Sequence, residues 1–450
     1  MSELLTREQR TRSPEEAALQ RQYAAIPPGE PVRLRKGTSN LFRDRRRSSQ
    51  PGLDASAFAS VLSVDPASRT AEVGGMTTYE DLVDATLPYG LMPLVVPQLK
   101  TITLGGAVTG LGIESSSFRN GMPHESVIEM HVLTGDGRVV TARADNEHAD
   151  LFRGFPNSYG TLGYALRLKI ELEPVRPYVR LRHRRFSDPE AFFAAMAEAE
   201  PDFMDGTVFG PREMYLTLGE FSNEAPSVSD YTGMEIYYRS LQRRETDHLT
   251  VRDYLWRWDT DWFWCSRAFG VQDRRLRRLV PKRLLRSDSY WKLVAFERRH
   301  GPMRGLDRLR GLPEQEHVVQ DIEVPVDRAP DFFRFLIEEI PILPFWVCPL
   351  RLRDPAGWDL YALERDTLYV NFGFWSTVPL AAGEADGANN RRIEEVVERL
   401  GGRKSLYSTS FYDAETFWRL YNGPVYRDLK EAYDPEGRLL DLYEKCVANG

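Results

Sequence analysis

Apolar and polar residues alternate along several short stretches in the first 180 residues of the chain. In residues 166–172 every second residue is Leu or Ile and the others are charged, which predicts a strand with one buried face. Strand-forming residues at 127–133 and 139–140 lie on either side of Gly135-Asp136-Gly137, a pattern typical of a hairpin. A further short strand is expected over residues 32–35, where it enters a glycine turn.

Helices are indicated by capping residues and by apolar residues at helical spacing. Thr77 followed by Glu80 is the pattern of a capping box, so we expect a helix over Thr78–Leu87, ended by Pro88 and Gly90. Further helices are expected to begin at Asp188-Pro189, to cover Asp331–Ile340 and Ile393–Leu400, and to begin at Asp413.

The mixture of short strands and helices predicts an α+β fold of at least two layers. Two prolines near residue 178 interrupt the pattern, and the chain beyond them is richer in aromatic residues. We therefore place one domain boundary near residue 178 and a second near residue 400. Residues 1–30 are polar, end in Pro27-Pro28-Gly29 and are expected to form a tail.

Composition excludes several classes of protein. The 450 residues are 42% hydrophobic and carry a formal charge of −7, which gives no reason to expect a nucleic-acid partner. Cys265, Cys348 and Cys446 lie too far apart for a zinc site or a disulfide framework. The N-terminus lacks the apolar core of a signal peptide, and the longest apolar run, Ile340–Leu350, is too short and too interrupted by proline to span a bilayer. We expect a cytoplasmic protein without a metal site.

Residues 97–121 are unusually rich in small residues. Glycines at this density let the backbone approach an anion closely, and their amides can then hold a pyrophosphate. A tight turn between two strands is the alternative interpretation. The segment is neither a P-loop, since no Gly-Lys-Ser/Thr follows, nor the common dinucleotide fingerprint, which should follow a strand directly. The small residues are Gly105, Gly106, Gly110, Gly112, Ser115, Ser116 and Ser117.

The order of these motifs resembles the flavin-binding domain of the vanillyl-alcohol oxidase and p-cresol methylhydroxylase family. The motifs are LRKGTSN (34–40), TLGGAVTGLG (103–112), the glycine hairpin, GTLGYALRLKIEL (160–172) and YRDLKEAYDPEGRLL (426–440). Within that family, the chain looks most like the Δ24-sterol reductase branch. That likeness rests on LGGAVTGLGIESSSFRNG, EHVVQDIEVP (316–325), LPFWVCPL (343–350) and FYDAETFWRLYNG (411–423).

The resemblance implies a p-cresol methylhydroxylase-type FAD domain over residues 31–178, an α+β cap over 179–400 and a C-terminal segment, 401–450, that returns to the FAD domain. It implies that Thr103, Gly105, Gly106, Gly110, Gly112, Glu114, Ser115 and Ser116 line the FAD, that Gly37, Thr38 and Ser39 touch its pyrophosphate side, and that Gly160, Leu162 and Gly163 pass close to the flavin. No histidine stands in the Gly37-Thr38-Ser39 turn, where many relatives attach FAD, so the resemblance predicts non-covalent FAD.

The same resemblance implies a reductase that saturates an isolated C=C bond, which requires a hydride from the flavin and a proton from an acid. Candidate acids are Glu114, His317, Asp321, Tyr412 and Glu125. Glu114 has an alternative role as a hydrogen-bond acceptor beside the FAD, and His317 and Asp321 have one as hydrogen-bonded residues of the cap sheet.

The N-terminal membrane segment of eukaryotic sterol reductases is not seen here. A methylene-branched fatty acyl chain, made by a partner methyltransferase, is therefore placed before a Δ24-sterol as the substrate. NADPH is the expected reductant. The alternatives are an oxidase of a sugar or alcohol that uses O2, and a flavin- or lipid-binding protein without turnover.

Two further stretches allow two interpretations each. Aromatic residues near 256–264 and 345–375 fit either a core or an apolar slot for a lipid chain. Residues 273–286 combine seven basic residues with an apolar side, and fit either an acidic partner (an anionic membrane surface or an acidic carrier) or a solvated helix.

Overall fold

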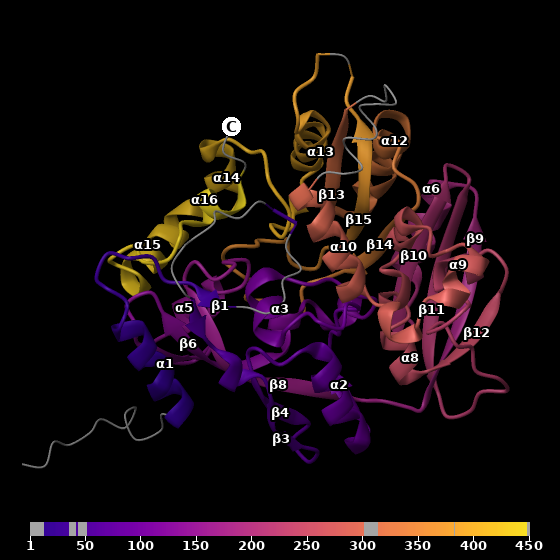
Figure 1. The fold of residues 1–450 in the computed structure, drawn as a ribbon. Helices are drawn as coiled ribbons and strands as arrows, with labels where there is room; N and C mark the ends of the chain where they lie inside the picture. The colour runs from indigo at the N-terminus through magenta and orange to yellow at the C-terminus, as the bar shows by residue number, and fades with distance from the viewer. Residues whose placement is uncertain (1–12, 36–41, 44–51, 301–313, 382, 448–450) are drawn as a thin grey trace, which may run out of the picture.

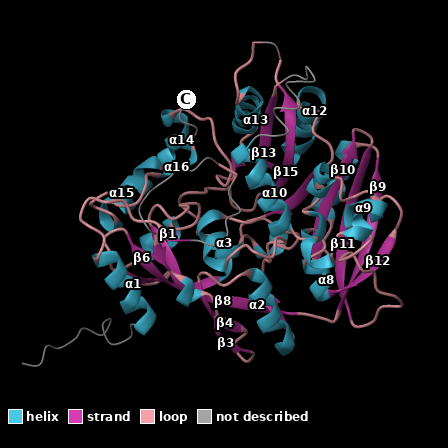
Figure 2. Cartoon of the chain, viewed as in Figure 1, coloured by secondary structure: helices cyan, strands magenta, loops and turns pink. Residues whose placement is uncertain are grey.

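The computed structural model describes residues 13–35, 42–43, 52–300, 314–381 and 383–447. The described residues form two large β-sheets and a separate two-stranded sheet. Helices pack around the sheets, as Figures 1 and 2 show. This arrangement confirms the expected α+β class. The helices are α1 Pro14–Ala24, α2 Tyr79–Thr86, α3 Leu104–Gly110, α4 Ser117–Asn120, α5 Ala149–Gly154, α6 Pro189–Glu198, α7 Tyr237–Ser240, α8 Val251–Leu255, α9 Arg274–Leu279, α10 Ser287–His300, α12 Ala329–Glu339, α13 Ala388–Arg399, α14 Ala414–Leu420, α15 Gly423–Tyr433 and α16 Leu442–Cys446.

The first sheet belongs to the N-terminal part of the chain and has the strand order β3-β4-β8-β6-β7, with β5 paired to β8. Alternate residues of β8 are buried, as the sequence pattern predicts, and the predicted hairpin is the antiparallel pair of β6 and β7. The strands are β3 Val61–Asp65, β4 Thr70–Gly74, β5 Leu91–Pro93, β6 Val127–Thr134, β7 Val139–Ala142 and β8 Gly163–Pro174; β1 Leu34–Arg35 and β2 Leu53–Asp54 form a separate parallel pair.

The second sheet has eight strands in the order β12-β9-β11-β10-β14-β15-β13-β16. Helices α6 and α12 pack on one face, where Phe193 and Phe332 contact Phe372 and Phe192 is buried in the same cluster. The opposite face is turned toward the first domain. The strands are β9 Tyr178–Phe186, β10 Phe203–Gly210, β11 Glu213–Ser222, β12 Thr246–Thr250, β13 Gln315–Pro325, β14 Phe345–Leu350, β15 Tyr369–Pro379 and β16 Arg403–Lys404.

Two local expectations need correction. The cap of α2 is Thr78, whose hydroxyl accepts from the Asp81 amide, and not Thr77. Residues 14–24 are not part of a tail: they form α1, which buries Leu19 and Tyr23 and donates a hydrogen bond from the Tyr23 hydroxyl to the Gly135 carbonyl, at 2.5 Å. A polar helix was missed because only one of its faces packs on the domain.

The C-terminal segment serves both domains. Beyond residue 400, β16 first extends the second sheet by pairing with β13, and helices α14 to α16 then run beside the first domain (Figure 1). Tyr433 of α15 donates to Asp150 of α5, and Lys430 donates to the Thr161 carbonyl. The chain thus crosses between the domains more than once.

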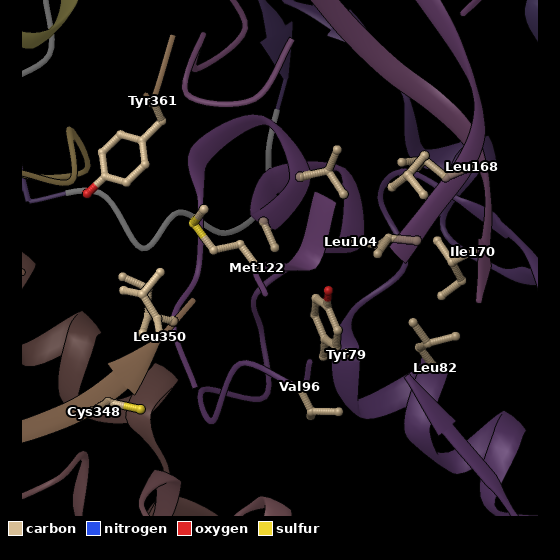
Figure 3. Packing of buried hydrophobic residues seen from close by; sticks show 14 of the residues in the cluster. Tyr79, Leu82, Val96, Leu104, Met122, Leu168, Ile170, Cys348, Leu350 and Tyr361 are labelled. Carbon is tan, nitrogen blue, oxygen red and sulfur yellow. The ribbon is translucent and has the colours of Figure 1, made fainter. Parts of the chain in front are cut away.

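One hydrophobic core spans the domain boundary. Figure 3 shows Leu104 of α3 and Leu168 of β8 in the same cluster as Cys348 and Leu350 of β14. Burial of this apolar surface fixes the two domains against each other. A search of the described helices finds no segment with the length and hydropathy to cross a membrane.

Candidate active site

The glycine-rich segment folds back on the first sheet and then forms the short helix α3. The Leu104 amide donates to the Thr77 carbonyl and the Gly105 amide to the Gly75 carbonyl, both at 2.9 Å. A Cβ atom at Gly105 would lie 2.7 Å from that Gly75 oxygen, so a larger residue cannot pack there. A Cβ atom at Gly106 would meet only the Thr103 hydroxyl, at 2.9 Å, because the rest of its surroundings is open cavity.

That cavity has a volume of about 940 Å³ and lies between the two domains. The volume is at the upper end of the range of ligand-binding pockets. One wall is the glycine segment with residues 97–114. The opposite wall comes from the cap, and the C-terminal residues 444–447 and Arg43 close a third side.

Arg43 brings a buried positive charge to this cavity. Its Nη1 donates to the Leu406 carbonyl at 2.6 Å and to the Cys446 sulfur at 2.7 Å, and its guanidinium stacks over the Tyr159 ring. Its Nη2 and the Tyr159 hydroxyl are buried and have no hydrogen-bond partner within the part of the chain that the structure describes. Buried groups of this kind normally have a partner, so the cavity offers donors to a ligand.

Glu114 lies at the end of the glycine segment and is buried. It accepts hydrogen bonds from the Gln98 amide at 2.9 Å and from the Gln98 side chain at 2.5 Å. Burial raises the pKa of Glu114 to about 8, although the Gln98 donors and the Arg257 charge act in the opposite direction. Glu114 is therefore largely protonated at neutral pH.

Asp321 of β13 is the carboxylate of the cap wall. Its Oδ1 accepts from the Asn371 side chain at 3.2 Å, and Gly373 on the paired strand leaves room for it, since a Cβ atom there would lie 2.5 Å from that oxygen. Burial raises the pKa of Asp321 to about 6 against the hydrogen bonds from Asn371 and Tyr407. Trp375 in turn donates to the Tyr407 hydroxyl at 3.1 Å.

Aromatic side chains surround Asp321 in the cap wall. Phe263 and Trp375 lie with ring centroids 4.6 Å apart, and Phe263 and Trp346 lie 5.7 Å apart. Trp346 donates from its indole to buried Asp205 at 3.1 Å, which in turn is paired with Arg257 at 2.7 Å. Core packing accounts for most of the aromatic residues: Phe345, Phe372 and Phe374 face the core under α6 and α12. Trp346 and Trp375, which have the opposite strand parity, line the cavity.

The structure brings together part of the predicted site. Thr103, Gly105, Gly106, Gly110, Gly112, Glu114, Gly160 and Asp321 line the cavity. Ser115 instead shares a hydrogen bond with the Tyr254 hydroxyl at 2.9 Å, and Ser116 donates to the Leu94 carbonyl at 2.8 Å. Leu162 and Gly163 are buried behind the wall. Gly37, Thr38 and Ser39 lie outside the described residues.

Three of the proposed acids do not belong to the described lining of the cavity. Glu125 is buried and accepts hydrogen bonds from the Arg353 and Asp354 amides, both at 2.7 Å. His317 is an exposed residue of β13, four positions before Asp321. Tyr412 is buried beside Tyr421, where burial raises its pKa well above the ordinary value. None of these three side chains lines the cavity.

Sequence reasoning missed several residues of the lining. Arg43, Gln98, Tyr159, Asn371 and Tyr407 contribute polar atoms to the cavity, and all except Gln98 come from outside the glycine segment. A signal exists for Asn371 alone: it alternates with Phe372 and Phe374 and is a polar residue on an apolar strand. The others are brought in by tertiary contacts that no local pattern encodes.

Comparison with known proteins agrees with this geometry. Residues 15–143 match the family model described as FAD binding domain. The chain is 25% identical over 449 residues to a Delta(24)-sterol reductase of Pisum sativum, covering 90% of this chain and 77% of the relative. It is 26% identical over 409 residues to that of Homo sapiens, covering 86% and 76%. Cytokinin dehydrogenase 6 of Oryza sativa subsp. japonica is 32% identical over 168 residues, which cover 36% of this chain and 31% of the relative.

The residues present fit an FAD. The open face of Gly106, the unpaired Nη2 of Arg43 and the unpaired oxygens of Gln98 and Tyr159 supply space and hydrogen-bonding atoms for a dinucleotide. The chain therefore carries an FAD-binding domain of the p-cresol methylhydroxylase type and is an FAD-dependent oxidoreductase distantly homologous to the Delta(24)-sterol reductases.

Proposed function

We propose that this protein is an FAD-dependent reductase that saturates an isolated C=C bond in a long apolar lipid. The observation that carries the proposal is the cap wall: Asp321, a carboxyl group whose pKa is raised to about 6, lies among aromatic side chains and faces the glycine wall across one cavity. Two of its relatives are named Delta(24)-sterol reductase, a name that describes the reduction of a lipid.

The chain's own residues divide the work between the two walls. Thr103 and the glycines of α3 hold the cofactor together with Arg43, and FAD, when bound, supplies the hydride. Asp321 in its protonated form delivers a proton to the other carbon of the double bond, so that the two carbons gain one hydride and one proton. Trp346, Trp375 and Phe263 exclude water and pack the lipid chain.

The surroundings of Asp321 suit it to donate a proton. Asn371 and Tyr407 fix its position, and burial stabilises the neutral acid. An acid with a pKa near the working pH is both protonated often enough and acidic enough to transfer its proton. Glu114 is protonated as well, but both of its oxygens accept hydrogen bonds from Gln98, and we assign it to the support of the cofactor.

The proposed substrate is a methylene-branched fatty acyl chain, which a methyltransferase would have to make beforehand, with a Δ24-sterol as the second candidate. The proposed reductant is NADPH. An aromatic, apolar wall with one acid suits either lipid better than a sugar, whose hydroxyl groups need many polar partners.

An anaerobic spectroscopic titration tests the proposal. The FAD-loaded protein is mixed with NADPH until the flavin absorbance bleaches, and a methylene-branched acyl lipid or a Δ24-sterol is then added. The expected result is the return of the oxidised spectrum together with one saturated product per flavin, identified by mass spectrometry. Bleaching by a sugar or alcohol and rapid recovery with O2 would instead identify an oxidase, and a flavin that never bleaches would identify a binding protein.

A further inference from the structure

A second surface of the cap carries exposed apolar side chains together with arginines. Leu279 of α9 is 79% exposed, Leu276 is 51% exposed and Leu284 is 48% exposed. Leu343 and Met234 are also exposed and line a neighbouring groove. We call these five residues and the basic side chains beside them the leucine–arginine surface. Contiguous exposed apolar residues on a folded domain normally mark a contact with another molecule or with a membrane.

Basic residues surround these apolar side chains. Arg274, Arg275 and Arg278 of α9 are exposed, and so are Lys282 and Arg283 in the turn that follows. The groove next to α9 has a volume of about 560 Å³, and its lining includes Arg239, Arg243, Arg267 and Arg274. The acidic side chains close by are Asp230, which pairs with Lys282 at 3.4 Å, Glu235, which lies 3.7 Å from Arg243, and Asp273, which caps α9. On this surface basic groups therefore outnumber acidic ones, although the overall charge of the protein is −7.

The structure corrects the simpler picture of residues 273–286 as one amphipathic helix. The segment is the short helix α9 followed by a turn, and two of its seven basic residues point inward. Arg277 is buried and donates two hydrogen bonds to Asp261, at 2.5 and 3.0 Å, and Arg286 donates to Glu80 of the first domain at 2.7 Å. These ion pairs anchor the segment, and five basic residues remain at the surface.

We propose that the leucine–arginine surface docks the protein on the face of a bilayer that contains anionic phospholipids. Guanidinium groups bind phosphate in a bidentate manner, and leucines beside them can enter the boundary between headgroups and acyl chains. The choice of a membrane over a protein partner rests on charge complementarity together with the place of the most exposed leucines. Leu276, Leu279 and Leu284 lie on α9 and in the turn after it and are exposed, and they do not belong to the lining of the groove that contains Leu343 and Met234.

The docking surface is joined to the wall of the cavity. Asp261, which holds Arg277, immediately precedes Trp262 and Phe263, and both of these aromatic residues line the cavity. One ion pair and one step along the chain therefore connect α9 to the aromatic wall. The proposal itself stands on the surface and does not depend on the reaction assigned to the cavity.

Vesicle sedimentation tests the proposal with the FAD-loaded, full-length protein. Vesicles of phosphatidylglycerol with phosphatidylcholine should carry the protein down at low salt, whereas vesicles of phosphatidylcholine alone should bind it much more weakly. Replacing Arg274, Arg275 and Arg278 by Gln should lower the partition coefficient by about tenfold or more, since each basic residue near the surface contributes separately. Leu276→Gln with Leu279→Gln should lower it as well.

Matched variants control for charge and for apolar exposure. Arg328→Gln, Arg399→Gln and Arg419→Gln together remove three exposed arginines from other parts of the molecule, and Leu62→Gln removes a leucine that is 53% exposed on β3. Both controls should bind as the unaltered protein does, and all variants should keep their flavin absorbance. Unaltered protein that ignores phosphatidylglycerol vesicles at low salt, or surface variants that bind as well as the controls, would overturn the proposal.

Discussion

The surroundings of two carboxyl groups in the cavity, Asp321 and Glu114, set their pKa values. Asp321 and Glu114 face one cavity from opposite walls, and burial raises the pKa of each, to about 6 and about 8. Asp321 has the smaller pKa shift of the two, and it accepts hydrogen bonds from two different side chains, Asn371 and Tyr407. Two carboxyl groups with separate pKa values in one cavity are an arrangement in which one acid can act on the substrate while the other supports the site.

Asp321→Asn should abolish most of the reductase activity while leaving the flavin in place. The amide keeps the size of the carboxyl group but has no proton of suitable acidity to donate, so turnover should fall by about 10²–10⁴-fold. In the unaltered protein the step that consumes the lipid should slow as pH rises above about 6, because the acid form is lost. Stopped-flow reoxidation of the flavin by substrate at several pH values measures both effects. Asp327→Asn, an exposed neighbour, is the control and should change neither.

Glu114→Gln should alter how the stability of the FAD-free protein depends on pH. Burial raises the folded-state pKa from 4.5 to about 8, so the contribution of Glu114 to stability is fully present below 4.5 and is lost as pH rises through 8. The loss is at most about 1.4 kcal/mol per pH unit in that window. The neutral amide escapes this loss, so the variant should gain in melting temperature relative to the unaltered protein between pH 5 and 8. Parallel melting curves for the two proteins across that range, or an equal gain in the exposed control Glu147→Gln, would contradict the assignment.

At the scale of elements, strand parity separates function from packing in the cap. On β15 the residues Phe372 and Phe374 pack under helices, whereas Asn371 and Trp375 line the cavity. The sequence alone predicted the aromatic clusters, β8, the β6–β7 hairpin and the helices that begin after Asp188 and Asp413, because periodicity and capping are local. It could not assign which face of β15 meets the cavity, because that depends on how the second sheet packs against the first.

The glycine segment forms a helix whose start lies at the cavity, and this gives a test of the cofactor site. Gly106→Val adds a branched side chain that would press on the Thr103 hydroxyl and occupy open cavity. FAD affinity should fall by about 10–100-fold, the effect of overpacking by 1–3 kcal/mol. The ratio of flavin absorbance to protein absorbance, with far-ultraviolet circular dichroism as the check on folding, measures the result. Gly210→Val is the matched control, since a Cβ atom at Gly210 has nothing within 4 Å. A Gly106→Val protein with full flavin content would contradict the placement of the cofactor against Gly106.

Helix α9 offers a comparison between a buried and an exposed arginine on the same element. Arg277→Gln leaves Asp261 buried without its partner and should lower the free energy of unfolding by about 3–5 kcal/mol. Arg275→Gln changes an exposed residue and should stay within about 0.5 kcal/mol. Chemical denaturation of both variants measures the difference. Equal stabilities would mean that the ion pair with Asp261 does not anchor the helix.

At the scale of the whole molecule, the cavity is assembled from segments that are far apart in the chain. Arg43, the glycine segment, the cap residues 262–263, 321 and 371–375, and the C-terminal residues 444–447 all contribute to its lining. The density of glycines indicated the anion-binding segment, and the resemblance to a family supplied the cofactor. The guanidinium of Arg43 beside Cys446 could not be foreseen, because about 400 residues separate two groups that only the finished fold brings together.

This assembly predicts that FAD is held without a covalent bond and that it couples the two domains. No histidine belongs to the described lining of the cavity, and its one cysteine, Cys446, accepts a hydrogen bond from Arg43 while burial raises its pKa, which keeps the sulfur in the unreactive thiol form. Heating the yellow protein should therefore release all of its flavin into the filtrate.

Because residues of both domains line the cavity, added FAD should also raise the melting temperature of the whole molecule in one transition, by a stabilisation of about 2.7 kcal/mol at a hundredfold excess over Kd. Flavin fluorescence that stays with the denatured chain on a gel would refute non-covalent binding. A cap whose melting temperature is independent of FAD would refute the coupling of the two domains, since a ligand bound by one domain alone stabilises only that domain.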